Sequence, residues 1–131
     1  MDETTPKSFT KLEIAIWLAC LVVLATLLWT EKLSIEAQQR DSTRKFAMNA
    51  IRANLEEVTY PSLKGYPESL NSKYLTAVDK SLLQDQKGVV INRPNSEYSY
   101  EPSSCSDGVC QHYILRAVLE KEAPFIQKSL R

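Results

Sequence analysis

The sequence has little glycine, one histidine and no excess of charge of either sign. Its 131 residues include three Gly, and 16 Lys and Arg balance 16 Asp and Glu. The scarcity of glycine excludes a collagen-like or glycine-rich low-complexity chain, and no internal repeat indicates a solenoid. Zero net charge argues against broad electrostatic binding to nucleic acid. The length suits one small domain and little else.

Charged residues are also missing from one continuous stretch. No Asp, Glu, Lys or Arg occurs between residues 14 and 30, and neither Gly nor Pro interrupts the stretch. A helix over residues 12–29 rises roughly 27 Å, about the thickness of a bilayer core. The roughly 100 remaining residues are polar and bury only a small core, too small to surround such a helix or to form a deep, dry active site. We therefore predict one membrane-spanning helix.

The flanks of this span decide between an anchor and a cleaved secretory signal. Trp29 lies at its far end, where an indole suits the headgroup region, and no small-residue cleavage pattern follows. Glu13 lies one residue inside the near end. A carboxylate costs on the order of 3 kcal/mol at the centre of a span and less at its edge. Glu13 either reaches the interface or meets a cation within the membrane.

Residues 8–13 read Ser-Phe-Thr-Lys-Leu-Glu and stand directly before the apolar run. This segment resembles the class III signal of type IV pilins and pseudopilins. The resemblance implies that prepilin peptidase cleaves between Ser8 and Phe9 and methylates Phe9. It also implies that Glu13 pairs with the N-terminal amine of a neighbouring subunit during assembly. The chain departs from the family pattern at Ser8, where Gly is usual, and at Lys11, where an apolar residue is usual.

The resemblance implies a structural subunit, a pilin or pseudopilin, of a type IV pilus or a type II secretion-like filament. Its partners are then prepilin peptidase, other pilin subunits, a membrane platform protein, an assembly ATPase and, before assembly, the lipid bilayer. The resemblance also implies a single-pass inner-membrane protein with a cytoplasmic N-terminus and an extracytoplasmic head. After assembly, the protein forms part of a periplasmic or extracellular filament. The basic residues after the span favour the opposite orientation. The alternative is a bitopic protein whose uncleaved anchor displays a small extracytoplasmic binding domain.

Helical periodicity continues well beyond the span. Ala47, Ile51, Leu55 and Val58 recur at helical spacing, and no Gly or Pro occurs before Pro61. We predict one helix over residues 10–57, roughly 70 Å long, whose last turns cover a small domain. Two helices with a hinge within residues 34–45 are the alternative. Pro and Gly residues between 61 and 67 then end the helix.

Three segments predict strands: 88–91, 97–101 and 111–120. We expect a three-stranded antiparallel meander against the second half of the helix, an α+β fold that resembles a pilin. The organisation is then a leader at 1–8, a transmembrane and filament-core half of the helix at 9–30, and an extracytoplasmic head at 31–131. Within the head, the helix covers 31–58, a loop region 59–87 and the sheet 88–120. Residues 121–131 are left without a predicted element.

Two cysteines and the single histidine are the residues in the second half of the chain that could form a metal or catalytic site. Cys105 and Cys110 flank an Asp-Gly turn, which predicts a disulfide and an oxidising compartment; two free thiols on a cytosolic hairpin are the alternative. Together with His112 they supply three zinc ligands where about four are needed, so no metal or cofactor is expected. Nothing marks a nucleophile or an acid beside His112. We predict no catalytic residues, and a small membrane-anchored enzyme using His112 or the loop cysteines is the remotest alternative.

Overall fold

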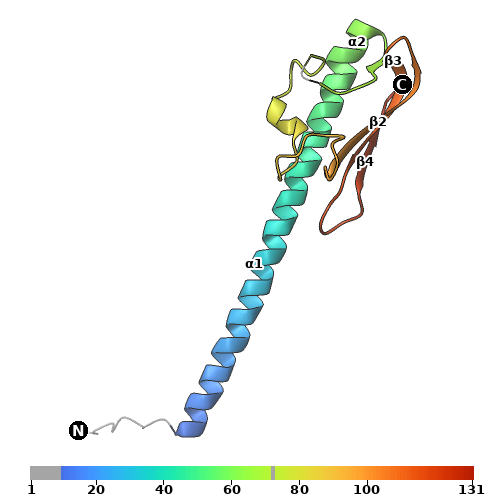
Figure 1. The fold of residues 1–131 in the computed structure, drawn as a ribbon. Coiled ribbons are helices and arrows are strands. Elements are labelled where there is room, and N and C mark those ends of the chain that lie inside the picture. Colours follow the sequence, from blue (N-terminus) through green and yellow to red (C-terminus); the bar gives the residue numbers. More distant parts are fainter. Residues whose placement is uncertain (1–9, 72) are drawn as a thin grey trace. The chain divides into compact units, whose positions relative to one another are not determined.

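The computed structural model describes residues 10–71 and 73–131. One helical run consists of α1 (Lys11–Asn54), a π-helical segment η1 (Leu55–Thr59) and α2 (Tyr60–Leu63). After it come β1 (Tyr66–Pro67), the 3₁₀ turn η2 (Lys80–Leu83), β2 (Tyr98–Ser106), β3 (Val109–Ala117) and β4 (Phe125–Lys128) (Figure 1). The predicted α+β fold class, a long N-terminal helix packed on a small antiparallel sheet, is confirmed.

The helix is unbroken through residues 34–45, where a hinge was the alternative. It ends later than predicted, at Leu63 instead of residue 57. Pro61 does not stop it; Pro61 directly follows the π-helical segment η1, where the regular pairing of each N–H with the carbonyl four residues earlier is already interrupted. The run ends at Lys64, which has a φ of 55° and donates its N–H to the Tyr60 carbonyl at 2.8 Å.

The sheet has four strands, and β3 is its centre. β2 pairs along one edge of β3; on the other edge, β1 pairs at Val109 and Cys110 and β4 pairs at residues 114–117. All pairings are antiparallel. Two of these strands, β2 and β3, were predicted; β1 lies in the predicted loop region 59–87, and β4 comes from the tail for which no element was predicted.

The predicted strand at 88–91 is wrong. An isolated bridge between Gln84 and Val90 is the only strand-like pairing there. The reason lies in Asp85, whose carboxylate accepts the backbone N–H groups of Lys87, Val89 and Glu97 at 2.9–3.0 Å. Those donors hold a turn around one side chain instead of joining a ladder.

The core lies between the second half of α1 and the inner face of the sheet. Ala47, Ile51 and Leu55 are buried, as their spacing predicted. The fourth residue of the predicted stripe, Val58, is 39% exposed, while Thr59 is buried. The π-helical turn at η1 adds a residue to the helical repeat and so rotates Val58 away from the core. Five of the six tyrosines belong to the core cluster or pack against it: Tyr60, Tyr66, Tyr98, Tyr100 and Tyr113.

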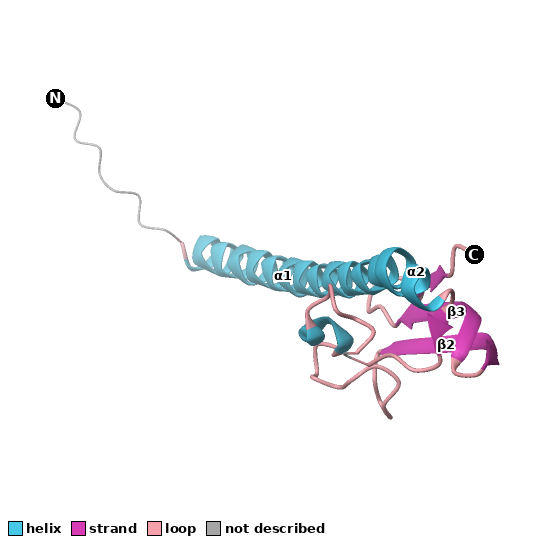
Figure 2. Cartoon of the chain, turned by 90° about the horizontal axis from the view of Figure 1, so that it is seen from above, coloured by secondary structure: helices cyan, strands magenta, loops and turns pink. Residues whose placement is uncertain are grey.

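The chain divides after Glu36 into two units, within the length of α1. We call residues 10–36 the N-terminal unit and Ala37–Arg131 the C-terminal unit. In the C-terminal unit, strands β2 and β3 and the loop with η2 lie against the helical run (Figure 2). The N-terminal unit consists of helix, and its large apolar side chains are exposed.

Candidate functional site

The helix begins with a reciprocal cap between Thr10 and Glu13. The backbone N–H and the hydroxyl of Thr10 donate to Glu13 Oε2 at 2.7 and 3.0 Å, and the Glu13 N–H donates to Thr10 Oγ1 at 3.4 Å. This is a capping box, which satisfies N–H groups that a helix start leaves without partners. Glu13 therefore has a local structural role that the sequence interpretation missed, although a Thr three residues before a Glu was the signal for it. Ser8 and Phe9, the predicted processing site, lie outside the described residues.

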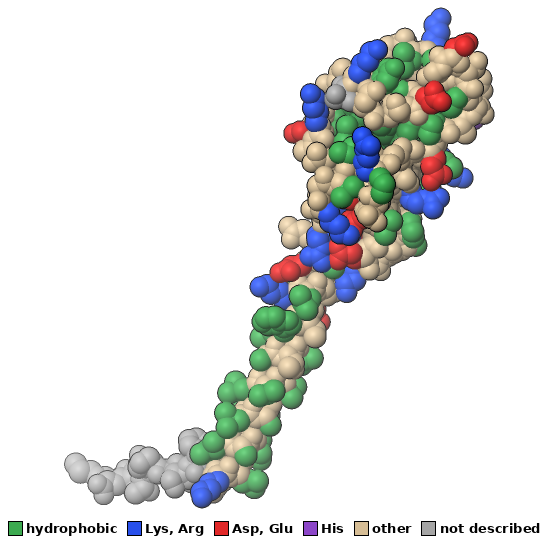
Figure 3. All heavy atoms as spheres, viewed as in Figure 1, with side chains coloured by type: hydrophobic (Ala, Val, Ile, Leu, Met, Phe, Trp, Pro, Cys, Tyr) green, Lys and Arg blue, Asp and Glu red, His purple; other side chains and the backbone are tan. Residues whose placement is uncertain are grey.

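The N-terminal unit has the chemistry of a membrane span. Hydrophobic side chains cover the visible face of this part of the helix (Figure 3), and the long helix is the one candidate span among the described residues. The hydroxyls of Thr26 and Thr30 are satisfied within the helix, since Thr26 donates to the Val23 carbonyl and Thr30 to the Leu27 carbonyl, each at 2.8 Å. Neither of these two hydroxyls then needs water. This unit is consistent with a single-pass membrane protein.

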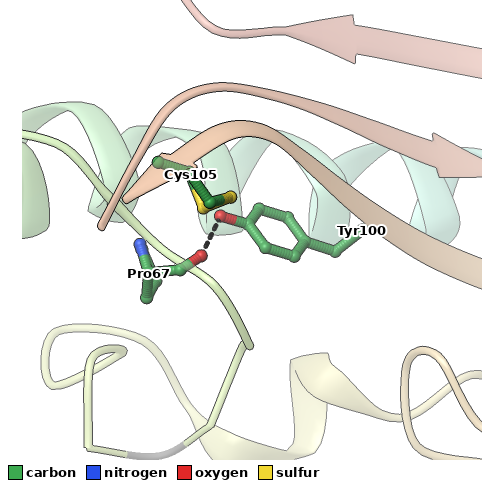
Figure 4. Close-up of a disulfide and its surroundings, with 4 residues drawn as sticks. Pro67, Tyr100 and Cys105 are labelled. Atoms are coloured by element: carbon green, nitrogen blue, oxygen red, sulfur yellow. Dashed lines mark hydrogen bonds between the residues drawn. A yellow bond between two sulfur atoms is a disulfide. The ribbon is translucent and has the colours of Figure 1, made fainter. Parts of the chain in front are cut away.

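The predicted disulfide between Cys105 and Cys110 is present. The two residues face each other across β2 and β3, which are joined by a two-residue turn with positive φ at Asp107 and Gly108. Figure 4 shows Cys105 near the hydroxyl of Tyr100, which donates to the Pro67 carbonyl at 2.6 Å. The disulfide leaves neither sulfur as a thiolate ligand, so the Cys105, Cys110 and His112 zinc set does not exist in this state.

Gly65 lets the helix end come close to this hairpin. A Cβ atom at this position would clash with the Val109 side chain and lie 2.8 Å from the Cys110 carbonyl oxygen. Only glycine permits that approach. The close contact places β1 beside the disulfide, so the hairpin is tied to the end of the helical run.

Replacing Cys105 and Cys110 together by Ala is expected to lower the free energy of unfolding by about 2 kcal/mol, because a short closed loop regains its entropy in the unfolded chain. Urea unfolding of the full chain in detergent measures this, and Cys20→Ala is the control, since Cys20 is a free, exposed cysteine of the span. Thiol titration of the denatured, unreduced chain should give one thiol. Three thiols would contradict the pairing.

A buried carboxylate, Glu56, organises the far end of the core. Its Oε2 accepts from the Tyr66 hydroxyl at 2.8 Å, and its Oε1 accepts from the Tyr113 hydroxyl at 2.9 Å and from the Leu130 N–H at 3.0 Å. Burial, reinforced by the Glu56 charge, raises the pKa of Tyr66 and Tyr113. Glu56 follows Arg52 by one helical turn, on the side of the helix that contacts β4 and the tail, and the sequence interpretation did not find this site. The site secures the tail after β4.

An ionic cluster joins α1 to the loop between β3 and β4. Asp41 and Arg44 are 2% and 3% exposed and bond to each other at 2.8 Å. Asp41 also accepts the N–H groups of Glu120 and Lys121 at 2.8 and 2.9 Å. Burial alone would raise the pKa of Asp41, but these N–H groups and Arg44 together lower it below its usual range.

The other side of Arg44 contacts two more carboxylates. Its Nη2 lies 2.7 Å from Glu97 and 2.9 Å from Glu120. Arg40 makes a two-pronged bond to Glu120 at 2.9 and 2.7 Å, and this bond, with Arg44, lowers the pKa of Glu120 to about 2. The sequence interpretation treated residues 34–45 only as a part of the helix that could hold a hinge, and it did not find this cluster.

His112 lies on the outward face of the sheet. It is exposed, and its Nδ1 lies 3.0 Å from the backbone oxygen of Arg131. Among residues 10–71 and 73–131, no group of three or more His, Cys, Asp or Glu side chains is placed to hold a metal ion. The polar constellations described above bind parts of the chain to one another.

Comparison with models of known protein families finds no match for this chain. Curated proteins and solved structures likewise give no match. A functional assignment for this chain therefore has to rest on its sequence motif and its own fold.

Proposed function

We propose that this chain is a structural filament subunit of the pilin or pseudopilin kind, and not an enzyme. The observation that carries the proposal is the Phe9–Glu13 segment directly before an uninterrupted apolar helix. Support comes from the fold, in which the second half of the same helix packs on a small antiparallel sheet. A long apolar helix with a small α+β unit is compatible with such a subunit.

The proposed mechanism begins in the bilayer, with the N-terminus in the cytoplasm. Prepilin peptidase cuts between Ser8 and Phe9 and leaves a methylated amine on Phe9. Subunits then exchange lipid contacts for contacts between their exposed apolar helices. Glu13 of one subunit accepts the charged amine of its neighbour, because a desolvated carboxylate is tolerable only beside a cation. An assembly ATPase and a platform protein supply the work of extraction.

The disulfide supports the proposed orientation. Disulfides persist in oxidising compartments, so Cys105–Cys110 fits a C-terminal unit outside the cytoplasm, in the periplasm and later on the filament surface. Against this orientation stands the count of basic residues, but Arg40 and Arg44, two of the four Lys and Arg within residues 32–45, are held in the ionic cluster. The span and the disulfide together support the proposal of a single-pass protein whose C-terminal unit lies outside the cytoplasm.

Shearing the cells and sedimenting released filaments tests this function. We expect the chain in the sedimented filament fraction as well as in the membrane fraction. A chain confined to the membrane, in cells that release filaments of other subunits, would contradict the proposal.

A bitopic protein with an uncleaved anchor is the second candidate. The capping box favours it, because Thr10 accounts for the position of Glu13 without any assembly partner. This candidate predicts an intact N-terminus. It also predicts that the location and amount of the chain do not change when Glu13 loses its charge.

A further inference from the structure

The C-terminal unit has an apolar groove on the side of α1 that the sheet does not cover. Its volume is about 380 Å³. Phe46, Ala53 and Val58 line it from the helical run, and Val78 and Leu82 line it from the loop before and within η2. Phe46 is 65% exposed although it follows Lys45 in a well-packed part of the helix. An aromatic side chain left in water there is a surface that a partner can cover.

The charged residues that line this groove are both acidic. Glu57 and Asp79 are exposed at its rim. In the part of the chain that the structure describes, neither makes a salt bridge, whereas the nearby Lys45 is paired with Glu122. The acidic groove therefore offers an apolar floor and two negative charges without a salt bridge, one of which, Asp79, also accepts the Ser81 N–H at 2.9 Å as the cap of η2. A fitting partner has apolar side chains between two cations.

The outward face of the sheet has that pattern. Ile126 on β4 lies opposite Arg116 on β3, and Lys128 lies opposite Ile114. Arg116 and Lys128 are exposed and make no salt bridge within the described residues, and Ile126 is 48% exposed. We call these four residues the basic face; the exposed Glu101 of β2, which lies opposite Ile114, borders it.

The groove and the basic face also lie at the same height along the axis of α1. Gln127, between Ile126 and Lys128, bonds to Asn49 and Arg52 on the helix. Those two residues fall between Phe46 and Val58, which line the groove. Side-by-side copies with parallel helices thus bring the basic face of one to the level of the acidic groove of the next.

We infer that the acidic groove binds the basic face of a second copy of this chain. The contact joins two different surfaces, so each bound copy still has one surface free and the association propagates in one direction. The inference rests on the proposed function for the idea that copies assemble side by side, and it adds the contact between their C-terminal units. Glu57 and Asp79 steer Arg116 and Lys128, and Phe46 is covered by Ile114 and Ile126.

Cysteine cross-linking of the full chain in its own membranes tests this contact. In a Cys20→Ser background, the chain carries Ala53→Cys in the groove and Ile126→Cys on the basic face. The double variant should give a ladder of dimers, trimers and larger species. The two single variants expressed together should stop at dimers, and each alone should stay monomeric. Dimers from either single variant alone, or no ladder from the double variant, would overturn the inference.

Charge reversal separates a lost contact from a damaged fold. In the cross-linking background, Glu57→Lys with Asp79→Lys should reduce the ladder about ten-fold or more, and adding Arg116→Glu with Lys128→Glu should restore it. Glu68→Lys is the charge-reversal control, since Glu68 is exposed outside the groove. An equal loss in the control, or no recovery in the fourfold variant, would count against the contact.

The outcomes also distinguish this inference from the proposed function. A ladder in membranes, from a chain that keeps its leader and never enters filaments, would leave the contact standing and the function refuted. Filaments that contain the chain but give no cross-linked ladder would support the proposed function and refute the contact.

Discussion

Replacing Glu13 by Gln should lower the amount of chain in sheared filaments about ten-fold or more, while cleavage before Phe9 continues. The proposed pairing of Glu13 with a neighbouring amine needs its charge. A neutral side chain would leave that amine desolvated and without a counter-ion, at a cost of several kcal/mol, and about 1.4 kcal/mol already changes an equilibrium ten-fold. The measurement is the amount of chain in filaments relative to the amount in membranes. The mass of the membrane-bound chain shows whether cleavage before Phe9 still occurs.

The capping box makes Gln the informative substitution. Gln serves at the third helical position as Glu does, so Glu13→Gln retains an acceptor for the Thr10 N–H and hydroxyl. Glu13→Ala removes the cap and the charge together. Thr10→Ala is the matched control, because it disturbs the cap and leaves the charge.

The three variants have opposite patterns under the two explanations. If the charge matters for assembly, the Gln and Ala variants both fail and Thr10→Ala assembles. If Glu13 serves only to cap the helix, the Gln variant is close to wild type, and the Ala variants at positions 10 and 13 share a mild defect. Normal assembly of the Gln variant would contradict the pairing mechanism.

Replacing Asp41 by Asn should destabilise the C-terminal unit by about 3 kcal/mol, because it removes one partner of a buried charge. Asp41 offers acceptors to Arg44 and to two backbone N–H groups. An amide retains one oxygen and turns an NH₂ group toward one of these donors. Urea unfolding of the full chain in detergent, followed by the near-ultraviolet circular dichroism of the core tyrosines, measures the loss.

A solvent-exposed pair on the same helix provides the control. Lys45 and Glu122 bond at 2.7 Å, with side chains 31% and 56% exposed. Such pairs contribute under about 1 kcal/mol, so Glu122→Gln should change stability little. Equal effects of Asp41→Asn and Glu122→Gln would contradict the role given to the ionic cluster.

The same Asp41 variant has a pH signature. Since folding lowers the pKa of Asp41, its contribution is full above the pKa of an unfolded Asp, about 4. It is lost as the pH falls through the lower pKa of the folded state. The difference in unfolding free energy between wild type and Asp41→Asn should therefore be constant from pH 7 to pH 5 and shrink below pH 4. A difference that grows in acid would contradict this account.

Elements with strong local signals were predictable from the sequence. The apolar run without Gly or Pro predicted the helix and the candidate membrane span. The Asp107-Gly108 turn predicted the hairpin and its disulfide. Ala47, Ile51 and Leu55 gave the buried stripe as far as the helix remained regular. Each of these features is determined by residues close together in the chain.

Most of the errors come from contacts between residues far apart in the chain. The burial of Asp41 depends on the N–H groups of Glu120 and Lys121, 79 and 80 residues away. The partners of Glu56 come from two strands and from the tail. The segment 88–91 is the exception: Val89 and Val90 have strand propensity, but Asp85, only four residues before Val89, accepts a backbone N–H that a strand would need.

The central claim is that the chain is processed before Phe9 for assembly. The intact mass and N-terminal sequence of the protein recovered from its own membranes test it most directly. The account predicts a chain that begins at a methylated Phe9 and lacks residues 1–8. A chain that still begins at Met1 or Asp2 would contradict it and leave the uncleaved membrane anchor as the explanation.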